Sequence, residues 1–162
     1  MFQINDVVVH YRDGISTITG TINMGGSEYF TVIAKRVGDV SIYVPVLTAA
    51  NVIRKVMTED EAIKLLEYMN GLPEVYNANT KQRRDEFKRR LSSGIIEDVA
   101  YLAKIYLLFL TKSFTIENVK YGQMDLDMLK DAYNRLFDEL SVSLSLDRKD
   151  VDSYVIEKLH LN

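Results

Sequence analysis

Apolar and polar residues alternate in short runs over the first third of the chain, and glycine-containing turns separate these runs. The strand-like runs are VVVHY, ISTITGTIN, EYFTVIAKR and SIYVPV, which begin at Val7, Ile15, Glu28 and Ser41. The turns contain Asp13-Gly14, Gly25-Gly26 and Gly38-Asp39, because a tight turn uses the conformational freedom of glycine. Short strands with a turn roughly every ten residues predict a small barrel or a strongly bent sheet.

After Thr58 the apolar period becomes helical. Thr58-Glu59-Asp60-Glu61 fits a capping box, in which the threonine side chain accepts the Glu61 N–H and the Glu61 side chain reaches back. The first helix is expected to end at Gly71, because Leu72-Pro73 stops it. Further helices are predicted over residues 80–91, 95–112, 122–144 and 147–159.

The change of period predicts an α+β protein with two domains. Residues 1–72 are expected to form a small β module with a closing helix, and residues 73–162 an all-helical bundle. A polar joint at residues 73–79 is expected to connect them.

Pro45 interrupts the last strand-like run. Proline cannot donate a hydrogen bond to a sheet ladder, so the strand around it is predicted to lie at an edge or to end at a bulge. Edge strands are normally protected by charge, yet no charged residue lies between Ser41 and Leu47. Either a later helix covers this edge, or the edge is open for a partner strand.

Composition narrows the class of protein. The 162 residues contain no cysteine, which excludes a disulfide framework and a cysteine metal site. The N-terminus lacks the features of a signal peptide, and no apolar run approaches the ~20 residues needed to span a bilayer. We expect a soluble, cytoplasmic protein with no membrane partner.

Candidate catalytic and ligand-binding chemistry is sparse. His10 and His160 lie at opposite ends of the chain with no acid at ligand spacing, so no metal site is predicted. Gly25-Gly26 precedes no helix and does not fit a phosphate-binding loop. Asp125 lies near a helix start, where a capping role is favoured over catalysis. We predict a protein that is not an enzyme and has no cofactor or small-molecule substrate.

One short segment gathers positive charge in an acidic chain. Residues 77–94 hold six of the twenty Lys and Arg residues, although the formal net charge of the chain is -3. In the helix predicted here, Phe87 and Leu91 lie together as the buried stripe. The spacing predicts that Arg89 pairs with Asp85 and that Arg90 pairs with Glu86.

The other basic residues of this helix have less explanation from ion pairs. Lys81, Arg84 and Lys88 form a row on one flank of the apolar stripe, and Arg83 lies on the opposite flank. The row is either a solvated helix face or a surface that follows the phosphate backbone of a nucleic acid.

Several of these features occur together in a known family. The chain resembles the CarD/CdnL family of bacterial transcription regulators along nearly its whole length. The resemblance rests on FQINDVVVHYRDGISTITG, on IYVPV followed by TAANVIRKV, on the basic segment ending in RRLSSG, and on the late segments Met128–Ala132 and Phe137–Leu140.

The resemblance implies a fold, two partners and two sets of site residues. It implies a Tudor-like N-terminal module that binds the RNA polymerase β subunit through an edge strand, here Ile42, Tyr43, Val44 and Val46. It also implies a helical domain that meets promoter DNA at the upstream edge of the −10 region and stabilises the open complex. Weak, non-specific phosphate contacts then fall on Thr80, Lys81, Arg83, Arg84 and Lys88.

One departure from the family pattern bears on the DNA contact. Many members carry a tryptophan near the start of the basic helix, which they use as a wedge in the minor groove. This chain has no tryptophan, and Thr80 stands at that position. Tyr76 is the nearest aromatic alternative, although packing is the more common role for such a residue. A module that binds polymerase without contacting DNA is therefore the alternative function.

Overall fold

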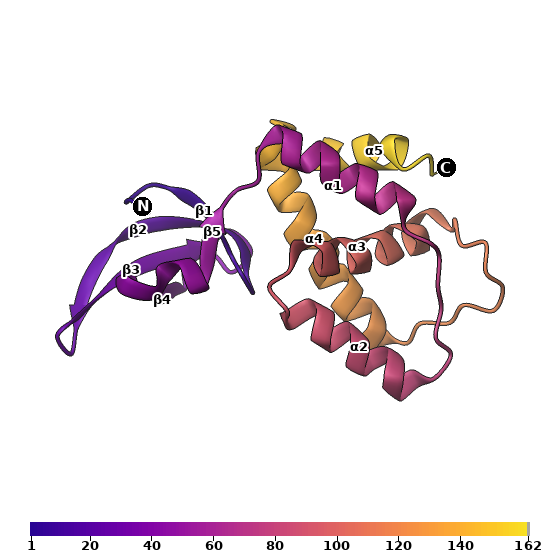
Figure 1. The fold of residues 1–162 in the computed structure, drawn as a ribbon, viewed down its shortest axis with the longest axis horizontal. Helices are drawn as coiled ribbons and strands as arrows, with labels where there is room; N and C mark the ends of the chain where they lie inside the picture. Colours follow the sequence, from indigo (N-terminus) through magenta and orange to yellow (C-terminus); the bar gives the residue numbers. More distant parts are fainter. Residues whose placement is uncertain (162) are drawn as a thin grey trace. The chain divides into compact units, whose positions relative to one another are not determined.

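The computed structural model describes residues 1–161 and divides into two compact units. The first unit is Met1–Met57 and the second begins at Thr58. Figure 1 shows the strands of the first unit and the helices of the second. The predicted α+β class, with strands first and helices afterwards, is confirmed.

The first unit is an antiparallel sheet with the strand order β4-β3-β2-β1-β5 (Figure 1). A 3-10 helix, η1, connects β4 to β5, and the sequence pattern predicted neither η1 nor β5 as a separate element. The bounds are β1 Val7–His10, β2 Gly14–Met24, β3 Ser27–Ala34, β4 Ser41–Pro45, η1 Val46–Asn51 and β5 Ile53–Lys55.

The turns of the sheet follow the glycine signals. Gly25 and Gly26 form the two-residue turn between β2 and β3, with φ angles of 59° and 82°. Two successive positive φ angles suit the type I′ turn, whose twist matches that of the flanking strands. The hairpin is therefore encoded locally.

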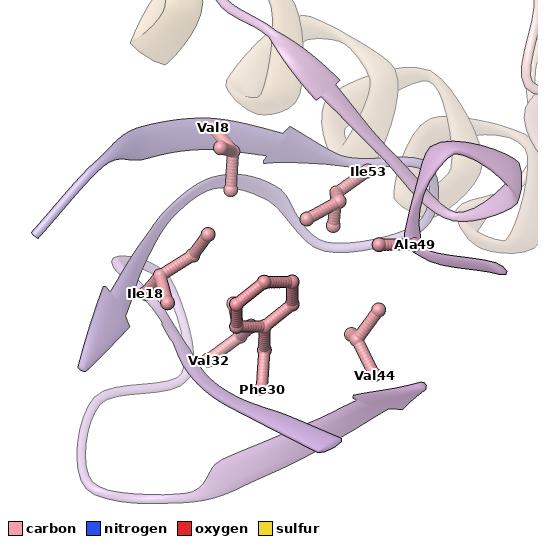
Figure 2. Close-up of a cluster of buried hydrophobic side chains, with 7 residues drawn as sticks. All are labelled: Val8, Ile18, Phe30, Val32, Val44, Ala49 and Ile53. Carbon is pink, nitrogen blue, oxygen red and sulfur yellow. The ribbon is translucent and has the colours of Figure 1, made fainter. Parts of the chain in front are cut away.

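The core of the β unit draws on every strand. Figure 2 shows the buried side chains converging: Val8, Ile18, Phe30, Val32, Val44, Ala49 and Ile53. Val44 and Ile53 come from the two opposite edges of the sheet, so the sheet must bend for them to share one cluster. Since β4 and β5 do not pair within residues 1–161, the sheet is strongly bent and is not closed into the alternative barrel.

Residues 58–161 of the second unit contain five helices, and each lies within about two residues of its prediction. Thr58 and Glu61 form the expected capping box, with hydrogen bonds of 3.1 Å in both directions. The long α4 packs against α2, α3 and α5. The bounds are α1 Glu59–Gly71, α2 Thr80–Ser92, α3 Ile96–Thr111, α4 Gln123–Ser143 and α5 Arg148–Lys158. No helix within residues 1–161 is long and apolar enough to cross a membrane.

The boundary between the units differs from the predicted one. The prediction assigned α1 to the β module at residues 1–72, but α1 packs against α3, α4 and α5 of the helical unit. Lys104 of α3 also donates hydrogen bonds to the carbonyls of Met69, at 2.6 Å, and Leu72, at 2.9 Å. These bonds satisfy carbonyls that the end of α1 leaves free. A helix built into the bundle by packing and capping belongs to that bundle.

The segment after α1, predicted to be a joint between domains, is also bound to the helical unit. The Glu74 carboxylate accepts the N–H groups of Thr115 and Ile116, at 2.9 and 2.8 Å, and the Thr115 hydroxyl at 2.8 Å. Burial alone would raise the pKa of Glu74, but these hydrogen bonds and the charge of Lys104 lower it below the ordinary value of 4.5. The segment is thus a strap across the bundle.

Candidate functional site

The side chains of β4 alternate between the core and the outside. Val44 is 1% exposed and lies in the core, and Ile42 and Val46 pack against that core. Tyr43 is 50% exposed and points to the other face. Among the four residues predicted to bind polymerase, Tyr43 exposes half of its side chain, and the other three pack in or against the core.

The main chain of β4 has an open side. Within residues 1–161, β4 pairs with β3 alone and is the last strand of the sheet. Tyr43 lies opposite Thr31, and Pro45 lies opposite Tyr29. The edge position inferred from Pro45 is therefore confirmed.

The most exposed apolar side chain beside this edge was not predicted as a site residue. Leu47 follows β4 on η1 and is 98% exposed, and Val40, just before β4, is 59% exposed. The signal was available in the sequence, since no charged residue occurs from Val40 to Ile53. Periodicity did not find Leu47, because a 3-10 helix of six residues is too short to show a pattern.

The basic helix α2 carries one arginine that does not face solvent. Arg83 is 5% exposed, and its guanidinium bonds Asp125 of α4 at 2.8 Å and the Asn77 carbonyl at 3.0 Å. The rings of Tyr76 and Tyr121 lie 5.6 and 5.7 Å from the same guanidinium. Arg83 is therefore removed from the predicted DNA surface, because its charge is used inside the bundle.

Asp125 organises this buried cluster. It is fully buried, accepts the Gly122 N–H at 3.0 Å at the start of α4, and lies 3.6 Å from Arg84 as well as beside Arg83. Burial alone would raise the pKa of Asp125, but the Arg83 hydrogen bond, the Gly122 N–H and the two positive charges lower it below the ordinary value of 3.8. The capping role expected for Asp125 is present, and Arg84 is partly committed to the same carboxylate.

The outer face of α2 has different ion pairs from those predicted. Asp85 binds Lys81 at 3.0 Å, and no ion pair within the described residues includes Arg89. Arg90 pairs with Glu86 as predicted, and it also bonds Asp98 at 2.7 Å and lies over the Tyr101 ring.

Arg89 and Lys88 are therefore the exposed cations of this helix with no ion-pair partner in residues 1–161. The helical wheel places them on either side of Asp85, with Lys81 on the same outer face. Lys81, Lys88 and Arg89 are thus exposed on the outer face of α2, whereas Arg84 of the predicted row is half-buried and lies 3.6 Å from Asp125.

The aromatic alternative to the missing tryptophan is bound within the bundle. The Tyr76 hydroxyl donates to the Lys120 carbonyl at 2.8 Å and accepts the Lys120 N–H at 3.2 Å. Its ring packs edge-on against Tyr121 at 5.5 Å. Thr80 is exposed on the first turn of α2, and its side chain is too small to act as an aromatic wedge. Tyr76 is thus a packing residue in this structure.

The comparison with known proteins concerns the β unit. Residues 2–57 match the family model described as CarD-like/TRCF RID domain, which is the RNA polymerase-interacting domain found in CarD. Residues 2–57 of the β unit are therefore similar to the CarD-like family. The matched residues end where the compact β unit ends, so the family domain and the structural unit coincide. No curated protein matches the chain.

The match confirms, over residues 2–57, the resemblance proposed from the sequence, and it supports RNA polymerase binding by the β unit. The matched family is an RNA polymerase-interacting domain and not an enzyme class.

Proposed function

We propose that this protein is a transcription regulator that docks on the β subunit of RNA polymerase through the free edge of β4. One observation carries the proposal: the RNA polymerase-interacting domain ends on one side in an edge strand with no charged residue. Edge strands without charge or cover are unusual, because they pair readily with other chains. Such an edge suits a protein whose function is to accept a partner strand.

The position of Pro45 supports this mode of binding. A proline is tolerated in an edge strand when its nitrogen faces away from the ladder. Residues two apart in an antiparallel strand turn their backbone groups to the same side, so Tyr43 would present its N–H and C=O to the partner. Main-chain hydrogen bonds would then supply affinity, and the exposed ring of Tyr43 would supply a side-chain contact.

The second part of the proposed function belongs to the helical unit. We propose that it contacts promoter DNA weakly at the upstream edge of the −10 region and stabilises the open complex. Lys81, Lys88 and Arg89 are the exposed cations of α2 suited to phosphate contacts. Contacts of this kind are weak alone, and they become effective when polymerase holds the protein beside the promoter. The protein would then act in the cytoplasm, at the nucleoid, in the company of polymerase.

A second candidate is a regulator that binds polymerase without touching DNA. It is favoured by the internal use of Arg83 and Arg84 at Asp125 and by the absence of tryptophan from the sequence. These features leave α2 with fewer free charges than its sequence suggests.

Two measurements separate the candidates. Binding of the full chain to the isolated β subunit tests the docking, and Tyr43→Glu should weaken it while circular dichroism shows an intact fold. Footprinting and lifetimes of promoter complexes, with and without the protein, test the DNA contact. Unchanged protection at the upstream edge of the −10 region, with normal polymerase binding, would leave only the second candidate.

A further inference from the structure

The side chain of Leu47 is exposed, although the 3-10 helix that carries it packs against the β core. Its side chain is 98% exposed, whereas Ala49 on the same 3-10 helix is buried in the β core. The helix is therefore firmly packed on one side while it presents a leucine to solvent on the other. Single exposed apolar residues are common, so the surroundings of Leu47 decide whether it matters.

The chain segment around Leu47 is uncharged and carries further exposed apolar residues. Val40, Tyr43 and Leu47 are all at least half exposed, and we call these three residues the apolar strip. The strip lies within fourteen residues, Val40 to Ile53, that contain no charge, in a chain of which 27% is charged. Exposed apolar side chains gathered in one uncharged segment favour an interaction site.

We propose that Leu47 is the apolar anchor of the polymerase contact and that the partner surface is an uncharged strand edge beside an apolar depression. This inference rests on the proposed docking through β4 and specifies its chemistry. A partner with charged groups at this contact would have to desolvate them against an edge that offers no counter-charge. An apolar depression instead gains the burial of the leucine side chain, which corresponds to roughly tenfold to hundredfold in affinity.

The test is a titration of RNA polymerase core enzyme with the full chain. Leu47→Ser removes the anchor, and Leu47→Met preserves its size and apolar character. Ile22→Ser is the matched control, because Ile22 is also an exposed apolar residue of the β unit but lies on β2, two strands away from β4. We expect Leu47→Ser to weaken binding roughly tenfold or more, and the other two variants to change it less than about threefold.

Salt provides an independent readout. Since the strip carries no charge, raising the salt concentration from about 0.1 to about 0.5 M should change the wild-type affinity less than about threefold. A steep fall with salt would overturn the uncharged partner surface.

The remaining outcomes separate the inference from the function on which it rests. If the wild-type chain does not bind polymerase, the proposed docking itself is wrong. If it binds and Leu47→Ser binds equally well, the docking stands and the anchor is refuted. A second copy of the chain could also occupy the apolar strip, and sedimentation of the free chain tests this alternative. If Leu47→Ser changes the sedimenting mass without changing polymerase affinity, the strip joins two copies and the proposal is overturned.

Discussion

The β4 segment carries no charge and the α2 segment is rich in positive charge, so the sequence points to α2 as the surface for a partner. In the structure, the β4 edge is the more accessible of the two. The α2 segment holds six basic residues, yet Arg83 and Arg84 contact Asp125, Arg90 contacts Glu86 and Asp98, and Lys81 contacts Asp85. The β4 segment carries no charge, yet one side of its main chain pairs with no other strand, and Leu47 just after it is almost fully exposed.

The number of charged residues in a sequence segment therefore does not measure the charge that is available to a partner. A buried guanidinium requires a carboxylate, and Asp125 of α4 provides one for Arg83. Part of the positive charge of α2 is therefore used to join α2 to α4. An uncharged edge strand, by contrast, is more available than its sequence suggests, since no charge within the strand prevents pairing with another chain.

The largest expected effect separates two neighbouring residues of β4. Val44→Glu places a carboxylate in the β core and should destabilise the unit by at least about 3 kcal/mol, enough to prevent its folding. Tyr43→Glu should leave the free energy of unfolding within about 1 kcal/mol and should weaken β-subunit binding roughly tenfold.

Urea denaturation and a binding titration on the two variants check this contrast. A folded Val44→Glu variant would show that β4 is not part of the packed sheet. A Tyr43→Glu variant with full affinity would mean that docking takes place elsewhere.

The next effect concerns the buried pair of the helical unit. Asp125→Asn leaves Arg83 without its ionic partner inside the bundle and should lower the free energy of unfolding by about 3 kcal/mol. Lys81→Ala is the matched control on the exposed side of α2, where losing the pair with Asp85 should change stability by less than about 1 kcal/mol. Urea unfolding curves of both variants measure the difference, and equal curves would mean that Arg83 has no structural role.

A smaller effect appears as a pH dependence at Glu74. Because its pKa in the folded chain lies below 4.5, its bonds to Thr115 and Ile116 stabilise the fold above about pH 4.5, and this contribution is lost as the pH falls through the folded pKa. Glu74→Gln should therefore reduce stability by about 1 kcal/mol at pH 7 and should remove part of the acid dependence. Thermal unfolding between pH 3 and pH 7 gives the result; identical acid profiles for both proteins would contradict it.

The smallest effect tests the revised DNA face of α2. Lys88→Gln with Arg89→Gln should leave polymerase binding unchanged and should shorten the open-complex lifetime. Two lost phosphate contacts should reduce the slope of log affinity against log salt by about 1.8 for the DNA-dependent part of binding. Replacing Arg84 alone should do less, because it lies beside Asp125. Unaltered lifetimes and slopes would leave α2 as a solvated helix face.

The sequence by itself determined the order and type of most elements, because their signals are local. The Gly25-Gly26 turn, the capping box at Thr58 and the edge position of Pro45 each depend on a few neighbouring residues, and the structure has all three. The similarity of the β unit to the CarD-like family could also be recognised from its sequence, since the matching residues form one continuous segment.

Tertiary structure decided what local signals cannot contain. Asp125 is 42 residues from Arg83, so no spacing rule could show that the two charges meet. Lys81 and Arg89 both lie four residues from Asp85, and only the folded structure shows that Asp85 pairs with Lys81. The assignment of α1 depends on its burial against α3 and on Lys104, 35 residues beyond Met69. The exposure of Leu47 likewise depends on which side of η1 the core occupies. Burial and long-range pairing are properties of the assembled chain, and they decide which residues remain available for a partner.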